Sequence, residues 1–389
     1  MTTRPGLVSW HELRLQLSAV LPDENRSLGI PPACYADDEL LALEQNAVFH
    51  HGWVGLGRAD RWADTGDYSA IDIGGVPLIV MRSKSGALKV FANSCRHRGS
   101  QLLSGDGNCK KIKCPFHWWT YDLDGRLKVY PRMENAVDFD PDKFGLVEFA
   151  VAVEHGFVFT SFEDQPPAIA EWLGDFDRFH QPWGINHWKT TRVREFEVDC
   201  NWKTFIEVFN EYYHLPMVHP ESINWLYPEP DAVDAVSGQY ATQFGATEGA
   251  AALMQDTQQY ALPTARGLQG REARGTRYTW IYPNLTFALS QDSMWMYQAF
   301  PLSANRCRAI QTICFPTESV ALDDFSERAE YYYQRIDAAL DEDLPFLLRQ
   351  QLGLNSKFAL QGRFGALEPS VGKFAYWYSQ QMLKQLSLT

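Results

Sequence analysis

Between His50 and about Phe162 the chain alternates apolar and polar residues in short runs that Gly and Asp residues separate. Runs of this length with a period of two, bounded by turn residues, predict short antiparallel strands. The clearest runs are YSAIDIGGVPLIVM (68–81), GALKVFANS (86–94), YDLDGRLKVY (121–130) and VAVEHGFVFTSF (151–162). The pattern therefore predicts a small all-β domain in this part of the chain.

The pattern differs on both sides of this segment. Residues 1–45 contain two helical stretches, and residues 164–174 (DQPPAIAEWLG) are typical of a linker that enters a helix. From Thr190 onward, strands alternate with two helices. The strands are expected at 190–200, 276–289, 294–300 and 307–316, and the helices at 202–215 and 323–352. This mixture favours an antiparallel sheet with helices against one face, so the predicted fold class is α+β.

Three segments follow from these patterns. We expect N-terminal helices over residues 1–45 that pack on the last domain, a β domain over 46–163, and an α+β domain over 164–389. A length of 389 residues allows two domains, each with its own core.

The charge pattern restricts the possible partners. The formal net charge is −13, and no long basic run is present. Binding to nucleic acid or to an anionic membrane surface depends on such runs, so we expect neither as a partner. The first residues lack the charged start and apolar core of a signal peptide, and no apolar run is long enough to span a bilayer.

Candidate chemistry is concentrated in the β segment, where Cys95 and His97 form C-x-H and Cys114 and His117 form C-x-x-H. A Rieske centre binds one iron through two thiolates and the other through two imidazoles. Zinc modules usually place two cysteines in one arm or two histidines in the other, whereas here each arm contains one of each. We interpret the four residues as ligands of a [2Fe–2S] cluster. The other five cysteines form no regular framework, which favours a reducing compartment, and we expect a cytoplasmic protein.

A second group of candidate ligands lies in NWKTFIEVFNEYYHLPMVHP (201–220). In a continuous helix, Glu211 and His214 would share one face, and a break at Pro216 could bring His214 and His219 together. Two histidines and a carboxylate form the facial triad of non-haem Fe(II) oxygenases, although H-x4-H alone also fits two unrelated surface histidines. The carboxylate must come from a distant segment. Asp343 is the best candidate, but spacing does not separate it from Glu342 or Asp341.

Together, C-x-H-R-G (95–99), C-P-x-H-x-W (114–119), Glu211-x2-His214-x4-His219 and the segment from Glu342-Asp343 to Leu354 resemble the oxygenase (α) component of the Rieske non-haem iron oxygenases. The resemblance implies an N-terminal all-β Rieske [2Fe–2S] domain and a catalytic domain of the helix-grip type. It implies mononuclear Fe(II) bound by His214, His219 and Asp343. It also implies that Glu211 links this site to a cluster histidine of the neighbouring subunit in a homotrimer. The family often has Gly at the position of Trp118.

The resemblance further implies an enzyme that uses O₂ and electrons from NAD(P)H. The chain has no GxGxxG fingerprint and no C-x4-C-x2-C motif, so we expect a separate flavin/iron–sulfur reductase. A simple Rieske electron carrier would not need the second histidine motif, and an iron-free paralogue would not need intact ligands.

The sequence around the histidines is most similar to oxygenases of quaternary ammonium or N-methyl compounds such as choline, carnitine or betaines. This similarity implies a monooxygenase that acts by N-demethylation or C–H hydroxylation. The alternative is a ring-hydroxylating oxygenase of an aromatic acid. An aromatic pocket favours a quaternary cation, whereas an aromatic-acid pocket should contain Arg or Lys. Five rings are possible walls of the pocket: Tyr278, Trp280, Tyr282, Trp295 and Tyr297.

Overall fold

The computed structural model describes residues 8–23, 26–227 and 230–388 and contains two compact units. One unit is Phe49–Pro167, and the rest of the described chain forms the other. Residues 1–7 of the expected N-terminal segment lie outside the described residues. The combination of a β unit and a mixed unit is the α+β architecture that the sequence predicts.

The unit Phe49–Pro167 is built from antiparallel strands. Its larger sheet has the order β1-β10-β9-β4-β3-β2-β5, and a small sheet has the order β6-β7-β8. In β2, Ser69, Ile71 and Ile73 are buried while the residues between them are partly exposed, which is the alternation expected for a strand covered on one face. The strands are β1 Val54–Arg58, β2 Asp67–Ile73, β3 Val76–Arg82, β4 Leu88–Ala92, β5 Asp106–Asn108, β6 Ile112–Lys113, β7 Thr120–Tyr121, β8 Leu127–Val129, β9 Glu148–Glu154 and β10 Phe157–Ser161.

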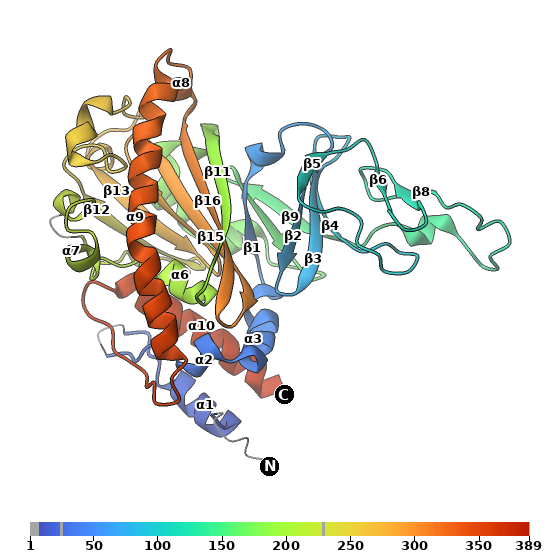
Figure 1. The fold of residues 1–389 in the computed structure, drawn as a ribbon, viewed down its shortest axis with the longest axis horizontal. Helices are drawn as coiled ribbons and strands as arrows, with labels where there is room; N and C mark the ends of the chain where they lie inside the picture. Colours follow the sequence, from blue (N-terminus) through green and yellow to red (C-terminus); the bar gives the residue numbers. More distant parts are fainter. Residues whose placement is uncertain (1–7, 24–25, 228–229, 389) are drawn as a thin grey trace. The chain divides into compact units, whose positions relative to one another are not determined.

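The second unit is organised around a six-stranded antiparallel sheet of order β11-β16-β15-β14-β13-β12. Helix α9 (Phe325–Leu354) runs across this sheet (Figure 1). Helix α5 (Phe176–His180) contacts β14 through Phe176, whose ring lies 6.3 Å from that of Phe287. The strands are β11 Trp188–Val198, β12 Tyr240–Ala246, β13 Gly275–Ile281, β14 Leu285–Leu289, β15 Met294–Ser303 and β16 Arg306–Pro316.

The N-terminal helices belong to this second unit. Helix α1 packs on α10, and the buried Lys203 side chain forms an ion pair with Glu44 of α3 at 2.5 Å. Helices α1, α3 and α9 lie close to their predicted positions, α10 was not predicted from the sequence, and one predicted helix is an exception. The helices are α1 Trp10–Ser18, α2 Ala33–Ala36, α3 Asp38–Glu44, α4 Ile169–Leu173, α5 Phe176–His180, α6 Trp202–Val208, α7 Leu215–Val218, α8 Thr317–Val320 and α10 Pro369–Leu388.

The exception is the predicted continuous helix over residues 202–215, which is wrong. Helix α6 ends at Val208, and α7 begins at Leu215. The Tyr212 N–H donates to the carbonyl of Leu367 at 3.0 Å, not to a carbonyl one turn earlier in the chain. Pro216 lies in the first turn of α7, where its missing N–H costs no helical hydrogen bond. The first helix therefore ends well before the proline, and the backbone that follows it binds a distant segment.

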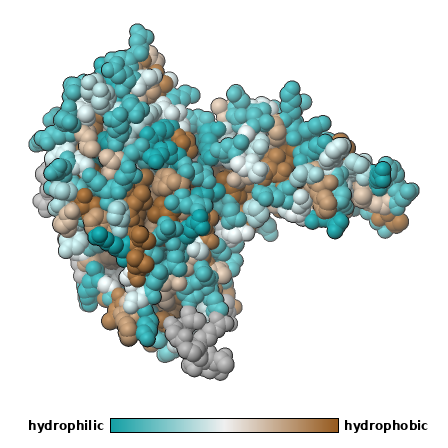
Figure 2. Space-filling view, in the orientation of Figure 1, coloured by the Kyte–Doolittle hydropathy of each residue, from teal (hydrophilic) through white to brown (hydrophobic). Residues whose placement is uncertain are grey.

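In the part of the chain that the structure describes, no helix combines the length and the apolar character needed to cross a bilayer. Hydrophilic residues cover most of the face drawn in Figure 2, with smaller hydrophobic areas among them.

Candidate functional site

The two Cys–His arms of the β unit form loops with the same hydrogen-bond pattern. In the first loop, Cys95 N–H donates to Ser100 at 2.8 Å and Gly99 N–H donates to Cys95 at 2.9 Å. In the second, Cys114 N–H donates to the carbonyl of Trp119 at 2.8 Å, and the N–H four residues after Cys114 donates to Cys114 at 3.1 Å. Because the two loops share this hydrogen-bond pattern, each carries one thiol and one imidazole at equivalent places.

These four side chains fit a [2Fe–2S] cluster. Cys95 and Cys114 are buried, and the rings of His97 and His117 lie 4.7 Å apart between centroids. The Nδ1 atom of His117 is buried and has no hydrogen-bond partner among the described residues, as expected for a nitrogen that binds a metal. Two thiols and two imidazoles are the donor set of a Rieske centre.

The thiols of this group differ in their environment. Burial raises the pKa of Cys95. Burial also opposes ionisation of Cys114, but backbone N–H groups of Phe116 and His117 outweigh it and lower the pKa of that thiol. The Tyr121 hydroxyl lies 3.4 Å from the Cys95 sulfur and accepts the Arg96 N–H at 3.0 Å. Hydrogen bonds to cluster sulfurs are one of the means by which a protein sets the cluster potential.

Trp118 occupies the position of the second loop that corresponds to Gly99. Both residues have a positive φ, 63° for Trp118 and 74° for Gly99. Glycine adopts this conformation without steric cost, whereas a side chain there is strained. The Trp118 ring is 60% exposed, and the ammonium of Lys113 lies 3.6 Å from its centroid. The structure thus explains why glycine suits this position, and this chain has tryptophan there.

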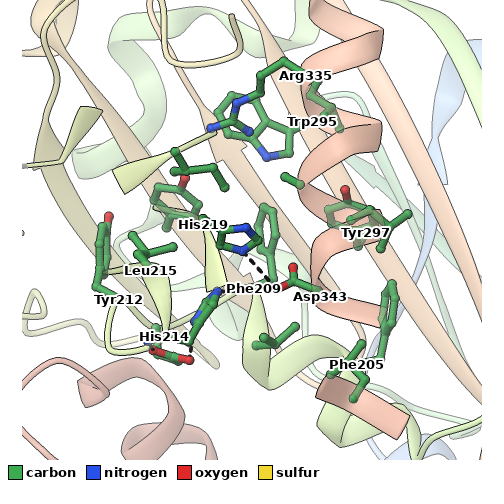
Figure 3. Close-up of a pocket in the computed structure, with 18 residues that line it drawn as sticks. Phe205, Phe209, Tyr212, His214, Leu215, His219, Trp295, Tyr297, Arg335 and Asp343 are labelled. Atoms are coloured by element: carbon green, nitrogen blue, oxygen red, sulfur yellow. Dashed lines mark hydrogen bonds and ion pairs between the residues drawn. The ribbon is translucent and has the colours of Figure 1, made fainter. Parts of the chain in front are cut away.

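In the second unit, the structure brings together His214, His219 and Asp343. One ligand atom from each lies within 4.8 Å of the others. Asp343 Oδ1 is 3.0 Å from Nε2 of His219 and 3.6 Å from Nε2 of His214 (Figure 3). His214 precedes α7 and His219 follows it, so this short helix sets the separation of the two imidazoles. Asp343 reaches them from α9.

Two more carboxylates contact the outer nitrogens of the histidines. Glu211 lies 2.5 Å from Nδ1 of His214, and Glu342 lies 2.6 Å from Nδ1 of His219. Glu342 also accepts a hydrogen bond from Ser222. Such contacts fix the tautomer and orientation of an imidazole, so that Nε2 is left for a metal. The sequence had offered Glu342 as an alternative to Asp343, but its carboxylate contacts the opposite nitrogen.

These residues fit a mononuclear iron. Asp343 Oδ1 is buried and has no hydrogen bond of acceptable geometry with any described residue, although both imidazoles lie near it. An unsatisfied buried carboxylate oxygen between two oriented imidazoles is the arrangement expected of a 2-His-1-carboxylate site. Burial alone would lower the pKa of His214, but Glu211 and then Asp343 outweigh it and raise that pKa. The negative surroundings therefore favour a cation here.

A pocket opens beside this group, and aromatic and aliphatic side chains line most of it. Of the five predicted rings, Tyr278, Trp295 and Tyr297 line it, and Trp280 and Tyr282 do not. Trp280 stacks instead on Phe374 of α10 at 3.9 Å, and Tyr282 also packs on Phe374. Sequence reasoning missed several lining residues because they come from other elements: Phe205, Phe209, Tyr212, Leu215, Arg335 and Leu347.

Comparison with known proteins identifies the two units. Residues 52–149 match the Rieske [2Fe-2S] domain, and residues 185–384 match the ring-hydroxylating α subunit (catalytic domain). The oxygenase subunit of glycine betaine monooxygenase from Chromohalobacter salexigens is 30% identical and covers 92% of this chain and 86% of its own. The oxygenase subunit of carnitine monooxygenase from Escherichia coli (strain K12) is 28% identical over 87% of each chain.

The fold is also that of a solved aromatic-ring enzyme. Naphthalene 1,2-dioxygenase from Rhodococcus sp., bound to indole, aligns with a TM-score of 0.78 at 19% identity over 96% of this chain and 98% of its own. This likeness concerns the fold alone.

A Rieske domain and a catalytic domain with a 2-His-1-carboxylate group, in one α+β chain, define the oxygenase component of a Rieske oxygenase. The chain belongs to the Rieske oxygenase α subunits, as its match to both family domains shows. It is a Rieske non-haem iron oxygenase, an oxidoreductase that incorporates O₂, and as an oxygenase subunit it depends on a reductase. Its cofactors are a [2Fe–2S] cluster and, at the group formed by His214, His219 and Asp343, a candidate mononuclear iron.

Proposed function

We propose that this protein is the oxygenase component of a monooxygenase that hydroxylates an N-methyl group of a small quaternary ammonium or N-methyl compound. The observation that carries the proposal is the aromatic pocket directly beside His214, His219 and Asp343. Aromatic faces attract quaternary cations through their quadrupoles. Relatives near 30% identity that are named glycine betaine and carnitine monooxygenase subunits support the same substrate class.

The proposed reaction is balanced with one O₂. An N–CH₃ group, O₂, two electrons and two protons give N–CH₂OH and water. The C–N bond of this carbinol then breaks and releases formaldehyde, a proton and the demethylated amine. When bound, the cluster supplies electron transfer from an NAD(P)H-dependent flavin/iron–sulfur reductase, and the iron supplies the activation of O₂.

The chain's own residues have separate tasks in this proposal. Cys95, His97, Cys114 and His117 hold the cluster, and His214, His219 and Asp343 hold the iron. The aromatic wall excludes water and holds the cation with a methyl group toward the iron ligands. Three observations support these roles: the thiols are buried, His117 Nδ1 and Asp343 Oδ1 have no hydrogen-bond partner among the described residues, and aromatic rings line the pocket.

We further propose that Glu211 connects the two kinds of site across subunits of a homotrimer. Its carboxylate holds Nδ1 of His214 and also accepts the backbone N–H of His214 at 3.1 Å. A carboxylate shared with a cluster histidine of a neighbouring subunit would orient both imidazoles and shorten the path for the electron.

The deciding experiment is substrate-dependent release of formaldehyde by the iron-loaded protein, with an NADH-driven reductase, across a panel of N-methyl betaines. Formaldehyde in proportion to O₂ uptake supports the proposal. Arg335 in the pocket wall favours a second candidate, the ring hydroxylation of an aromatic acid. That candidate takes over if no betaine gives formaldehyde while an aromatic acid stimulates coupled O₂ uptake.

A further inference from the structure

We infer that Arg335 binds a carboxylate of the substrate, so that the substrate class is a quaternary ammonium carboxylate, a zwitterion, and not a simple cation. The inference builds on the proposed function, because it names the second charged group of the molecule that the aromatic pocket receives.

The first observation is that Arg335 is buried and that two of its nitrogens have no hydrogen-bond partner within the described chain. Its side chain is 2% exposed, and it lines the pocket. Nε and Nη2 are buried and have no hydrogen-bond partner among the described residues. A guanidinium carries five donors and a permanent positive charge, and burial of such a group without an anion is strongly unfavourable. An anion that enters the pocket would remove this cost.

Neighbouring charges do not replace that anion. Asp337 lies two residues further along α9, but it is engaged by two other arginines, Arg192 and Arg194. The guanidinium of Arg335 instead lies 5.3 Å from the ring of Trp295. Contact with a ring face steadies the planar group, yet Nε and Nη2 still have no hydrogen-bond partner among the residues that the structure describes.

The second observation is the position of Arg335 relative to the candidate iron ligands. Arg335, Ala339 and Asp343 are four residues apart on α9, and all three line the pocket. Residues at this spacing share one helix face, and eight residues span about 12 Å of helix. Figure 3 shows Arg335 beside Trp295, with Asp343 further along the same helix. The guanidinium of Arg335 and the candidate iron ligands are thus at different ends of one pocket.

Aromatic rings occupy the walls between these ends. Tyr278 contacts Trp295 at 6.2 Å and Phe209 at 5.4 Å, and Phe209 contacts Tyr297 at 5.0 Å between ring centroids. A zwitterion fits this sequence of groups: its carboxylate forms a bidentate contact with Arg335, its onium group lies among the rings, and its methyl groups face the iron ligands. Choline offers Arg335 only a neutral hydroxyl and no anion.

The test is anaerobic calorimetric binding to the holoenzyme with matched pairs of ligands. Glycine betaine and choline form one pair, and benzoate and benzamide form another. The variants are Arg335→Gln and Arg335→Lys, and Arg349→Gln is the control because Arg349 is exposed on the same helix. Cluster absorbance and iron content confirm that each variant is folded and loaded.

We expect the wild-type protein and the Arg349→Gln variant to bind a carboxylate ligand more tightly than its uncharged or alcohol partner. Arg335→Gln should raise the dissociation constant of the carboxylate ligand by about 30- to 100-fold, in the range for a lost charged hydrogen bond. The dissociation constant of its uncharged or alcohol partner should stay within about twofold of the wild-type value. The Arg335→Lys variant should bind the carboxylate ligand with an affinity between those of the wild-type protein and Arg335→Gln, since lysine keeps the charge and loses the bidentate fork.

The two proposals fail differently. If Arg335 selects the carboxylate only in the benzoate pair, the carboxylate-binding role of Arg335 stands, but the assignment to a quaternary ammonium carboxylate and the N-methyl function both fall. If betaines release formaldehyde but Arg335→Gln weakens glycine betaine and choline equally, the proposed function stands and the carboxylate role of Arg335 falls. The absence of any Arg335-dependent preference for a carboxylate in both pairs also overturns the inference.

Discussion

Glu342 lies 2.6 Å from Nδ1 of His219, on the side of the imidazole opposite Asp343, whose Oδ1 is 3.0 Å from Nε2 of the same ring. Two consecutive residues of α9 thus contact the two nitrogens of one histidine. The same arrangement holds at His214, where Glu211 contacts Nδ1 and Asp343 faces Nε2. Each imidazole therefore has one carboxylate that orients it and one that shares its proposed metal.

The Glu342 contact predicts a role in iron retention. Glu342→Gln keeps the size of the side chain but removes the negative charge that fixes the His219 tautomer, and we expect about 10- to 100-fold weaker iron binding. Anaerobic competition with a chelator measures this affinity, and the [2Fe–2S] absorbance should be unchanged. Glu221→Gln, at an exposed position in the same segment, is the control. Equal iron affinity in both variants would show that the Glu342 contact is dispensable.

The two proposed metal sites should be separable by substitution. Asp343→Ala removes the only carboxylate near both Nε2 atoms among the described residues, so we expect loss of mononuclear iron with a normal Rieske spectrum. Cys114→Ser should do the reverse, since it removes a thiolate of the cluster and leaves α9 intact. Metal analysis together with visible spectroscopy distinguishes the two. Loss of both signals in Asp343→Ala would argue against independent sites.

The proposed bridging role of Glu211 predicts an electron-transfer defect. Glu211→Gln should also weaken iron binding, so it is loaded with excess Fe(II). In the loaded variant, the reduced cluster should be reoxidised about 100-fold more slowly when substrate and O₂ are added. Stopped-flow absorbance of the cluster in a single turnover gives this rate. Glu211→Asp, with the shorter carboxylate, should recover part of the rate. Normal reoxidation in Glu211→Gln would leave the carboxylate only its contact with His214.

Glu207 predicts a pH dependence of stability. It accepts a hydrogen bond from Tyr35 at 2.7 Å, and burial raises its pKa to about 7. The folded protein thus keeps a proton that the unfolded chain releases near pH 4.5, so stability falls as pH rises from about 4.5 to 7. Glu207→Gln should remove this fall, which amounts to about 3 kcal/mol. Urea unfolding from pH 5 to pH 8 measures it, and an unchanged slope would contradict the assignment.

The positive φ of Trp118 predicts an unusual order of stability for two variants. Trp118→Gly and Trp118→Ala both remove the ring and its contact with Lys113, but only glycine relaxes at φ 63°. We expect the glycine variant to be more stable than the alanine variant by about 1 kcal/mol, although glycine also adds entropy to the unfolded chain. Both variants should bind the cluster normally. Greater stability of the alanine variant would show that the backbone is not strained.

Some of this protein could be predicted from sequence because the relevant interactions are local. Each Cys–His arm is a single tight loop, so the spacing of Cys95 and His97, and of Cys114 and His117, defines a donor set by itself. The strands of the β unit follow from their alternation, and the α+β class follows from the order of strands and helices. His214 and His219 are separated by one short helix, so their proximity also depends on few residues.

Tertiary structure decided the rest, because distant segments compete with local preferences. After α6, where sequence periodicity predicted a continuous helix, the Tyr212 N–H donates to Leu367 in place of a carbonyl one turn earlier. The rotation of α9 about its axis determines that Asp343 faces the Nε2 atoms while Glu342 reaches Nδ1, although the two are adjacent in sequence. The same rotation places Arg335 in the pocket. Composition and spacing along one strand or helix do not specify such a rotation, since it is set by packing against elements far away in the chain.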